Sequence, residues 1–521
     1  MTEKSDRTRL IASATRRGQG RRPVAPPIER ASTLLNDTPG AMRDEGRGPV
    51  YGIEDLSAAR ALRDLLCDLE GATDAWLVPS GLAAVTVPLT ALLRSGDEVL
   101  TTDALYGPSR RFLKRHMGAR GVTTAFHDAA ASVEDILASI TDRTRLLLIE
   151  SPASLTFEML DVPALAAACR ARGVLTVMDN TWGAGLAFRP LAHGVDVSVQ
   201  AVTKYVSGHS DLLMGSIAVA GSSLGRPIAE TLEDLGWRVS PDDAWLALRG
   251  LRTLPLRYQE QARSARVVAD WLNARPEVAD ILYPALPGTP DHDLWTRNYT
   301  GAASIFGVVM KGGDETAAHA LMSALELFGL GYSWGGFESL ITHETGQLSG
   351  RRSPPALAGQ LLRLHVGLED PRDLIADLES PPVGSRVTIQ PPNSGAATAA
   401  ICIHSGCGII MMLATPPSTI RPAMTQPAQL FRDRRRATQP PATTAASQAN
   451  TTQALAASEA EATICFRSSG SAGSRPAGGG IAACPAISSP IRTTNATTTP
   501  ATIPRIVLSI GRPLQNMSGK P

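Results

Sequence analysis

The chain has 521 residues, a formal net charge of +1 and six cysteines. This length is enough for two or three domains with a buried core. The balanced charge argues against nucleic acid or a membrane surface as a partner. The cysteines are scattered over hundreds of residues, which excludes a disulfide framework and indicates the reducing cytoplasm. No segment has the apolar core of a signal peptide or the length of a membrane span.

Strand and helix patterns alternate in the first half of the chain. A helix near 108–117 lies between predicted strands at 98–101 and 122–126, and a helix over 161–172 lies between predicted strands at 144–149 and 174–178. Strand, helix and strand in this order predict right-handed crossovers in a mainly parallel sheet that helices cover on both faces. The sequence therefore predicts a three-layer α/β domain.

A second group of elements follows a long predicted helix at 245–275. Apolar runs predict strands at 278–283, 303–310 and 361–366, with a helix near 316–327. We interpret these elements as a smaller α/β domain that the long helix joins to the first. The predicted organisation is an N-terminal arm at 1–50, a large domain at 51–245, a small domain at 246–380 and a tail at 381–521.

Lys204 stands out because it follows an apolar strand at 195–199 and precedes a Gly/Ser turn. A lysine there is awkward as a surface charge. It suits an amine that forms a Schiff base, with its pKa lowered by burial. From this segment alone, a solvated lysine at the end of a loop is an equally good interpretation.

Asp179 comes at the carboxyl end of the buried strand at 174–178, where open α/β sheets bind their ligands. A pyridoxal 5′-phosphate (PLP) enzyme needs a carboxylate against the ring nitrogen of its cofactor. A helix cap or a turn is the structural alternative for this aspartate. Lys204 on the next strand weakens that alternative considerably.

Three further positions support a cofactor and substrate site only when they are taken together. Ser80-Gly81 precedes a helix and would offer backbone N–H groups to a phosphate, although it also fits ordinary helix capping. Tyr106 ends an apolar segment and could stack on a cofactor ring, but a half-buried loop tyrosine is the favoured interpretation in isolation. Arg363 lies inside an apolar strand and needs a carboxylate partner, either from a substrate or from an internal Asp or Glu.

Seven short motifs together resemble the Cys/Met-metabolism PLP-dependent enzymes, whose fold is that of aspartate aminotransferase (fold type I). The resemblance runs from near Thr8 to about Glu379, roughly three quarters of the chain. The motifs fall in family order: Glu150-Ser-Pro152, Asp179-Asn-Thr-Trp182, Thr203-Lys204-Tyr205, Gly208-His-Ser-Asp211, Gly250-Leu-Arg-Thr253, Tyr332-Ser-Trp-Gly-Gly336 and Arg363-Leu-His-Val-Gly-Leu-Glu-Asp370.

The resemblance implies a role for each matching residue. Lys204 is the expected Schiff-base lysine and catalytic residue, Asp179 the partner of the ring nitrogen, and Tyr106 the stacking tyrosine that assists catalysis. The expected phosphate contacts are Gly81, Leu82 and Thr203, together with Tyr51, which in this family reaches a neighbouring subunit. The expected substrate contacts are Arg363, Ser333, Trp334 and Tyr332. A homotetramer with shared active sites is therefore expected, and no metal site.

Within the family, the chain is most similar to the bacterial cystathionine β-lyases. The Tyr332-Ser-Trp334 run is typical of β-eliminating members, and γ-eliminating members tend to have an acidic residue in place of Tyr332. The implied reaction cleaves L-cystathionine to homocysteine, pyruvate and ammonia in methionine biosynthesis. The alternatives are a cysteine desulfhydrase or broad C–S lyase, a cystathionine γ-lyase or γ-synthase, and a catalytically inactive relative.

Two segments depart from the family pattern. Ile53 stands where the family has an arginine that grips the phosphate, and Arg60 is a possible replacement. After Glu379 the chain is dominated by Ala, Thr, Ser and Pro, which predicts a disordered extension or, as we favour, an out-of-frame translation. Cys402, His404 and Cys407 in this tail resemble half a metal site, but incidental residues are the better interpretation.

Overall fold

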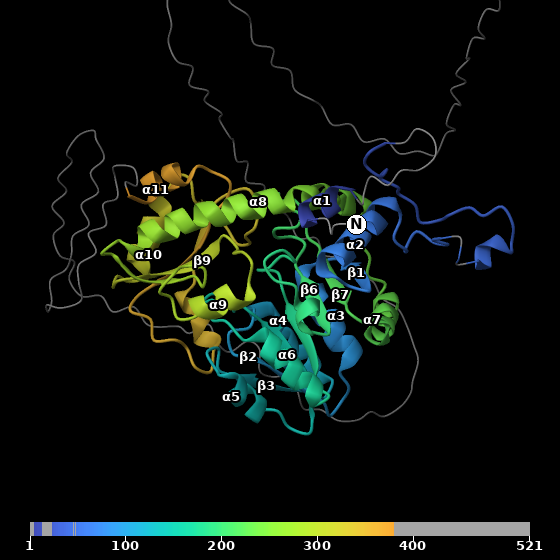
Figure 1. Ribbon diagram of the computed structural model, residues 1–521, viewed down its shortest axis with the longest axis horizontal. Helices are drawn as coiled ribbons and strands as arrows, with labels where there is room; N and C mark the ends of the chain where they lie inside the picture. The colour runs from blue at the N-terminus through green and yellow to red at the C-terminus, as the bar shows by residue number, and fades with distance from the viewer. Residues whose placement is uncertain (1–4, 13–22, 45, 47, 380–521) are drawn as a thin grey trace, which may run out of the picture. The chain divides into compact units, whose positions relative to one another are not determined.

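The computed structural model describes residues 5–12, 23–44, 46 and 48–379 (Figure 1). The predicted tail at 381–521, with Cys402, His404 and Cys407, lies outside the described residues. The predicted domain boundaries stay predictions.

The first sheet contains seven strands in the order β1-β7-β6-β5-β4-β2-β3. Its strands are β1 (Asp74–Val78), β2 (Glu98–Thr102), β3 (Thr123–His127), β4 (Thr144–Glu150), β5 (Leu175–Asp179), β6 (Val197–Gln200) and β7 (Gly215–Val219). The strands from β6 to β3 pair in parallel, and β7 pairs antiparallel with β6 and β1. The predicted mainly parallel sheet is confirmed.

Both faces of this sheet are buried, because successive side chains of a strand point to opposite faces. In β4, Leu147 and Ile149 join one apolar cluster, and Leu146 and Leu148 join the other. The covering helices are α2 (Ser57–Glu70), α3 (Gly81–Leu92), α4 (Gly107–Phe112), α5 (Val133–Ala138), α6 (Val162–Ala171) and α7 (Ser222–Leu235). The helix predicted near 108–117 is present, but its second half, Leu113–Met117, is a π-helical turn.

Helix α8 (Pro241–Asn273) is 33 residues long and joins the two sheets. The Ser240 side chain caps its N-terminus by accepting hydrogen bonds from the N–H groups of Asp242 and Asp243. It packs against α1 (Asp6–Ala12) and α2 beside the first sheet, and against α11 (Pro371–Glu379) beside the second (Figure 1). The long helix predicted at 245–275 is therefore confirmed.

The second sheet has the order β10-β11-β12-β9-β8. Its strands are β8 (Val278–Leu282), β9 (Ile305–Met310), β10 (Gly329–Leu330), β11 (Leu340–His343) and β12 (Leu361–His365), with helices α9 (His292–Asn298) and α10 (Glu315–Ala324). The helix predicted to reach residue 327 ends at Ala324. The chain turns away there because the Asp377 carboxylate accepts hydrogen bonds from the N–H groups of Glu326 and Leu327, both at 2.9 Å.

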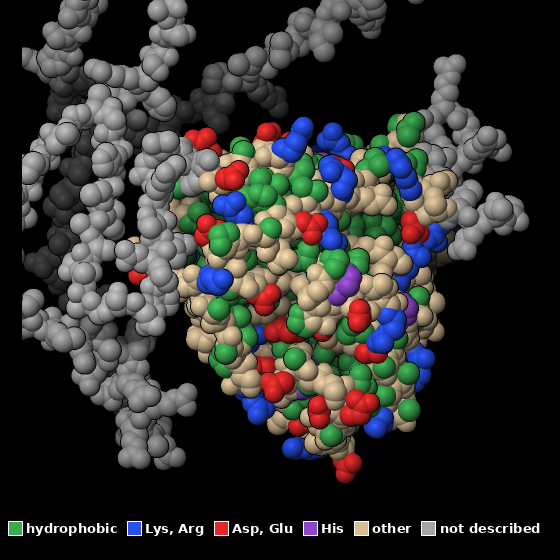
Figure 2. Space-filling view, turned by 60° about the vertical axis from the view of Figure 1, so that its left-hand side comes forward, with side chains coloured by type: hydrophobic (Ala, Val, Ile, Leu, Met, Phe, Trp, Pro, Cys, Tyr) green, Lys and Arg blue, Asp and Glu red, His purple; other side chains and the backbone are tan. Residues whose placement is uncertain are grey.

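Charges of both signs are interspersed with apolar side chains on the face shown in Figure 2. None of the helices in the described ranges combines the length and apolar character that crossing a membrane requires.

Candidate active site

Lys204 lies in the loop between β6 and β7, and its amine meets the loop between β10 and β11 of the second sheet. The Lys204 Nζ donates a 2.6 Å hydrogen bond to Ser333 Oγ and lies 5.1 Å from the centre of the Trp334 ring. Lys204 was predicted from one motif and Ser333 and Trp334 from another, and Lys204 and Ser333 are 129 positions apart. The structure therefore brings the predicted lysine and two predicted substrate contacts together.

Burial lowers the pKa of the Lys204 amine to about 8, with help from the positive charge of Arg363 and against the opposing effect of Asp179. A pKa of about 8 leaves part of the amine unprotonated near neutral pH. Such an amine can act as a nucleophile or a base, which an ordinary surface lysine cannot do at that pH.

Asp179 is the last residue of β5, and only one of its carboxylate oxygens is used. Its Oδ1 accepts hydrogen bonds from the Thr181 backbone N–H at 3.0 Å and from the Thr181 hydroxyl at 2.5 Å. Within the described ranges no group donates to Oδ2. Burial raises the pKa of Asp179 above its ordinary value, so a cation facing Oδ2 would relieve the cost of ionising it.

Glu150 lies next to Asp179, because β4 and β5 pair in register at these two residues. Its Oε2 accepts the backbone N–H of Tyr106 at 2.7 Å, and its Oε1 accepts the hydroxyl of Ser154 at 2.5 Å. Burial, followed by the charge of Asp179, raises the pKa of Glu150 to about 8. We assigned no role to Glu150 from the sequence; its place at the end of the strand beside Asp179 is the signal that could have found it.

Tyr106 precedes α4 and is 44% exposed. Burial, and then the negative charges of Asp179 and Glu150, raise the pKa of its phenol, whereas Arg363 lowers it. Tyr106 therefore lies within electrostatic range of the predicted ring partner and the predicted substrate arginine. Its raised pKa keeps the phenol protonated near neutral pH.

The start of α3 presents two unused backbone donors. Ser80 caps the helix by accepting the N–H of Ala83 at 3.1 Å, and no described group accepts the N–H of Gly81 or Leu82. A side chain at position 81 would meet the Ala201 Cβ at 2.5 Å, so only glycine allows this close approach to the lysine loop. Free N–H groups at a helix N-terminus are a natural site for a phosphate.

The Thr203 hydroxyl already forms two hydrogen bonds within the protein. Its hydroxyl donates to the Met214 carbonyl at 3.1 Å and accepts the Met214 N–H at 2.9 Å. Met214 lies 11 positions away and was not predicted as a partner of Thr203. A phosphate contact from this hydroxyl would require its hydrogen to turn away from Met214.

The loop at 332–336 packs directly on Lys204. Ser333 has a φ of 87° and Gly335 a φ of 84°, and a side chain at Gly335 would meet the Tyr205 nitrogen at 2.8 Å. Buried His365 holds this loop by accepting the Gly335 N–H at 3.0 Å through Nε2. Burial lowers the pKa of His365 to about 3, which keeps the ring neutral and able to accept.

Arg363, in β12, faces the same loop and has an internal partner. Its guanidinium lies 3.5 Å from the Glu344 Oε1 and donates to the Ser333 carbonyl at 3.5 Å. Both distances are long, and Glu344 also accepts from the Thr342 hydroxyl at 2.6 Å. Arg363 therefore keeps free donors for a substrate carboxylate. Glu344 is the internal carboxylate that the sequence analysis named as the alternative kind of partner.

Of the predicted residues, Tyr51 lies apart from this cluster. It is 52% exposed, and no described contact joins it to Lys204, Asp179 or Arg363. Tyr332 belongs to the loop on Lys204, and its side chain is 76% exposed. Gly52 donates its N–H to the Ser32 carbonyl at 2.9 Å, and Tyr51 forms an isolated antiparallel bridge with Thr33, so the Tyr51 segment packs against residues 32–33.

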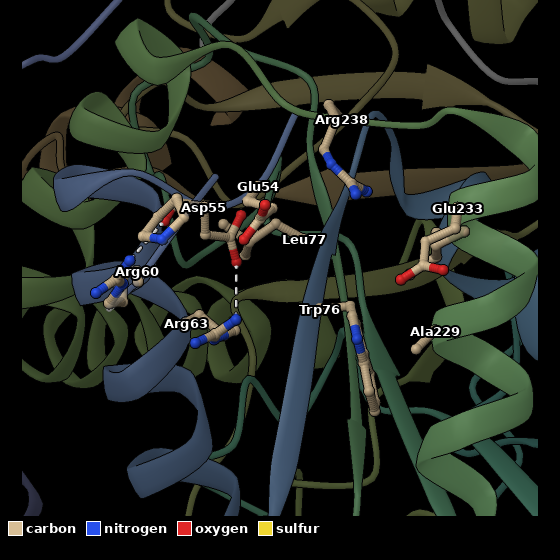
Figure 3. Close-up of a pocket in the computed structure, with 12 residues that line it drawn as sticks. Glu54, Asp55, Arg60, Arg63, Trp76, Leu77, Ala229, Glu233 and Arg238 are labelled. Atoms are coloured by element: carbon tan, nitrogen blue, oxygen red, sulfur yellow. Dashed lines mark hydrogen bonds and ion pairs between the residues drawn. The ribbon is translucent and has the colours of Figure 1, made fainter. Parts of the chain in front are cut away.

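A charged pocket of about 380 Å³ adjoins the Tyr51 segment (Figure 3). Within it Arg63 forms an ion pair of 3.2 Å with Asp55, and Arg60 donates to the Asp55 carbonyl at 3.3 Å. Arg60, the possible replacement for the arginine absent at Ile53, is thus engaged with Asp55. The pocket is lined by none of the predicted site residues.

The Lys204 cluster, together with the start of α3, fits a pyridoxal phosphate cofactor. It has an amine with a lowered pKa, a buried carboxylate with a free oxygen, two free N–H groups at a helix start and an arginine with donors to spare. The fit rests on these donor and acceptor sets, because they match an aldehyde, a ring nitrogen, a phosphate and a carboxylate.

Comparisons with known proteins agree with this fit. The sequence model of the family described as "Cys/Met metabolism PLP-dependent enzyme" matches residues 7–381. A putative cystathionine β-lyase of Rhizobium johnstonii is 42% identical over 68% of this chain and 90% of its own. A cystathionine β-lyase of Bordetella avium is 41% identical over 69% of this chain and 92% of its own. The crystal structure of metB from Corynebacterium glutamicum has a TM-score of 0.68 and 28% identity, over 72% of this chain and 97% of that one.

Proposed function

Because the chain belongs to the Cys/Met metabolism PLP-dependent enzyme family, we propose that it is a carbon–sulfur β-lyase that cleaves L-cystathionine to homocysteine, pyruvate and ammonia. The observation that carries this proposal is the contact between Lys204 and the Tyr332-Ser333-Trp334 loop, with Ser333 Oγ 2.6 Å from the amine. The names of the two relatives with 41–42% identity support the same reaction.

The residues around the first sheet would hold the cofactor. Lys204 would bind its aldehyde carbon, Asp179 its ring nitrogen through Oδ2, and Gly81 and Leu82 its phosphate. Tyr106 would stack on its ring. When bound, the cofactor supplies a protonated ring that withdraws electrons from the bonds at the substrate α-carbon.

The residues around the second sheet would hold the substrate. Arg363 would bind the α-carboxylate with its free donors, and charge-assisted hydrogen bonds of this kind favour a bidentate geometry. Ser333, already bonded to Lys204, would orient both the amine and the substrate. Trp334 and exposed Tyr332 would line the path of the sulfur-bearing side chain.

Proton movement would belong to Lys204. With a pKa of about 8, the unprotonated Nζ can remove the substrate α-proton and return a proton to the departing sulfur. Ser333 Oγ fixes the position of Nζ for both transfers. Tyr106, whose pKa is raised, would assist as a hydrogen-bond donor.

We further propose a cytoplasmic homotetramer that acts in methionine biosynthesis, with the large and small domains at 51–245 and 246–380. Exposed Tyr51 would bind the phosphate in a neighbouring subunit, since it contacts none of the site residues of its own chain. Thr203 would join that phosphate site only if its hydroxyl leaves Met214.

Product identification tests the reaction. The purified holoenzyme should convert L-cystathionine to pyruvate and homocysteine, with a higher kcat/KM than for L-cysteine. Formation of 2-oxobutyrate and cysteine would instead make it a γ-lyase. Faster release of sulfide from cysteine would make it a desulfhydrase, and bound cofactor without turnover would make it an inactive relative.

A further inference from the structure

Three potential metal ligands converge on the second sheet, outside the candidate active site. They are Glu315 and His319 of α10 and His343 of β11, and one ligand atom from each lies within 4.8 Å of the other two. Glu315 and His319 are four positions apart, which places both on one face of the helix. Their facing atoms, Glu315 Oε1 and His319 Nε2, are 3.7 Å apart.

His343 is held in the form that a metal ligand needs. Its Nε2 lies 2.8 Å from the Gln360 Oε1 and 3.1 Å from the Thr345 Oγ1, and the Gln360 amide nitrogen points to the Gly313 carbonyl at 3.5 Å. Gln360 therefore accepts at Oε1, so Nε2 carries the proton and Nδ1 keeps a free lone pair. Hydrogen bonds of this kind orient the imidazoles of established metal sites.

The spacing is close to that of a bound transition-metal ion. Zinc bonds of about 2.0–2.1 Å in a tetrahedral site put neighbouring ligand atoms about 3.4 Å apart. The side chains of Glu315 and His319 are 71% and 54% exposed, so they can close the remaining gap by rotation. The His319 and His343 rings also meet edge to face, with centres 5.1 Å apart.

We propose that Glu315, His319 and His343 form a binding site for a divalent transition-metal ion of the Zn²⁺ type. Two imidazoles and one carboxylate favour such an ion over Mg²⁺ or Ca²⁺, which prefer oxygen ligands. Three protein ligands leave a fourth position for water. The ion would join α10 to β11 and so act as a clip within the second sheet and its helix.

Zinc titration of the full-length holoenzyme, purified without a histidine tag and freed of metal with a chelator, tests the proposal. We expect saturable Zn²⁺ binding by calorimetry that weakens at least tenfold in His319→Ala and in His343→Ala. His116→Ala, which removes an exposed histidine outside the cluster, should leave the affinity unchanged. The Cys402→Ser/Cys407→Ser variant should also bind normally.

Two further measurements test whether the variant is folded and which ligand atoms bind the zinc. Because the His319 side chain is 54% exposed, His319→Ala should keep the far-UV circular dichroism of the parent protein. X-ray absorption of the zinc-loaded protein should show nitrogen and oxygen at about 2.0–2.1 Å and no sulfur at about 2.3 Å. Sulfur in that shell, affinity unchanged in His319→Ala, or the absence of saturable binding would overturn the proposal.

Discussion

The two sides of the candidate site are built differently. The large-sheet side consists of Asp179, Glu150 and Tyr106, which follow or border the carboxyl ends of neighbouring parallel strands. The small-sheet side consists of Ser333, Trp334 and Arg363, which depend on a loop with left-handed residues and on an ion pair between β12 and the residue that follows β11.

This difference suggests that the large-sheet side serves cofactor binding and the small-sheet side serves substrate choice. Strand ends in a sheet buried on both faces hold their side chains rigidly, which suits a cofactor that every reaction of the family requires. A loop held by one histidine and a long ion pair can change with little effect on the sheet, which suits the choice of substrate. Changes on the small-sheet side should therefore alter substrate binding while the cofactor stays bound.

Lys204 lies between the two sides, and its loss should have the largest effect. Lys204→Ala removes both the proposed covalent attachment point and the proposed base, so kcat for cystathionine should fall at least about 1,000-fold. Steady-state pyruvate formation measures this, with Lys114→Ala, an exposed lysine, as the control. A Lys204→Ala enzyme within tenfold of the parent would contradict the assignment.

Arg363→Ala tests the small-sheet side. Loss of a charge-assisted hydrogen bond of about 1.5–3 kcal/mol should raise KM for cystathionine roughly 10- to 100-fold. The visible absorbance of the bound cofactor should survive dialysis as it does in the parent. Arg372→Ala, which removes an arginine that is 86% exposed, should change neither quantity. An unchanged KM in Arg363→Ala would contradict the role of the small-sheet side in substrate binding.

Glu150→Gln tests the large-sheet side through stability. The pKa of Glu150 is raised from 4.5 to about 8. A carboxyl with a raised folded pKa stabilises the fold below its unfolded pKa and loses that contribution as pH rises through the folded one. The cofactor-free protein should therefore lose unfolding free energy between about pH 5 and pH 8, and Glu150→Gln should reduce this loss by about 1–3 kcal/mol.

Urea denaturation at the two pH values measures that difference. The comparison uses the difference in unfolding free energy between the two pH values. The substitution also removes one hydrogen-bond acceptor from Tyr106 or Ser154, and this loss is the same at every pH. Glu134→Gln, at an exposed glutamate, should follow the parent. Parallel pH profiles for Glu150→Gln and the parent would show that this carboxyl is not buried beside Asp179 as described.

Substitutions of Ser333 should have the smallest effects. They distinguish the effect of its backbone conformation on stability from the effect of its hydroxyl on kcat. Its φ of 87° is unfavourable for a residue with a Cβ by about 1 kcal/mol, so Ser333→Gly should stabilise the fold by about that amount. Both Ser333→Gly and Ser333→Ala lose the hydroxyl that positions Lys204 and should lower kcat roughly three- to tenfold. Thermal unfolding and kinetics of the pair measure this; equal stability of the two variants would contradict the role of the backbone.

Each side of the site contains one carboxylate that the sequence did not identify, Glu150 on the large-sheet side and Glu344 on the small-sheet side. Asp179 and Lys204 follow apolar strands whose local pattern is plain, so their positions could be predicted without tertiary information. Glu344, the partner of Arg363, could not, because the two residues meet only through the pairing of β11 with β12. The helix that was predicted to reach residue 327 ends early for a similar reason, since its end depends on Asp377, about 50 positions away.

The most direct test of the account is the site of cofactor attachment. The holoenzyme should be treated with borohydride, digested and mapped by mass spectrometry, with Lys204→Ala treated in parallel. We expect the reduced cofactor on the peptide that contains Lys204 and none on the variant. Attachment at Lys114 or Lys311, or retention of the modification in Lys204→Ala, would contradict the central claim.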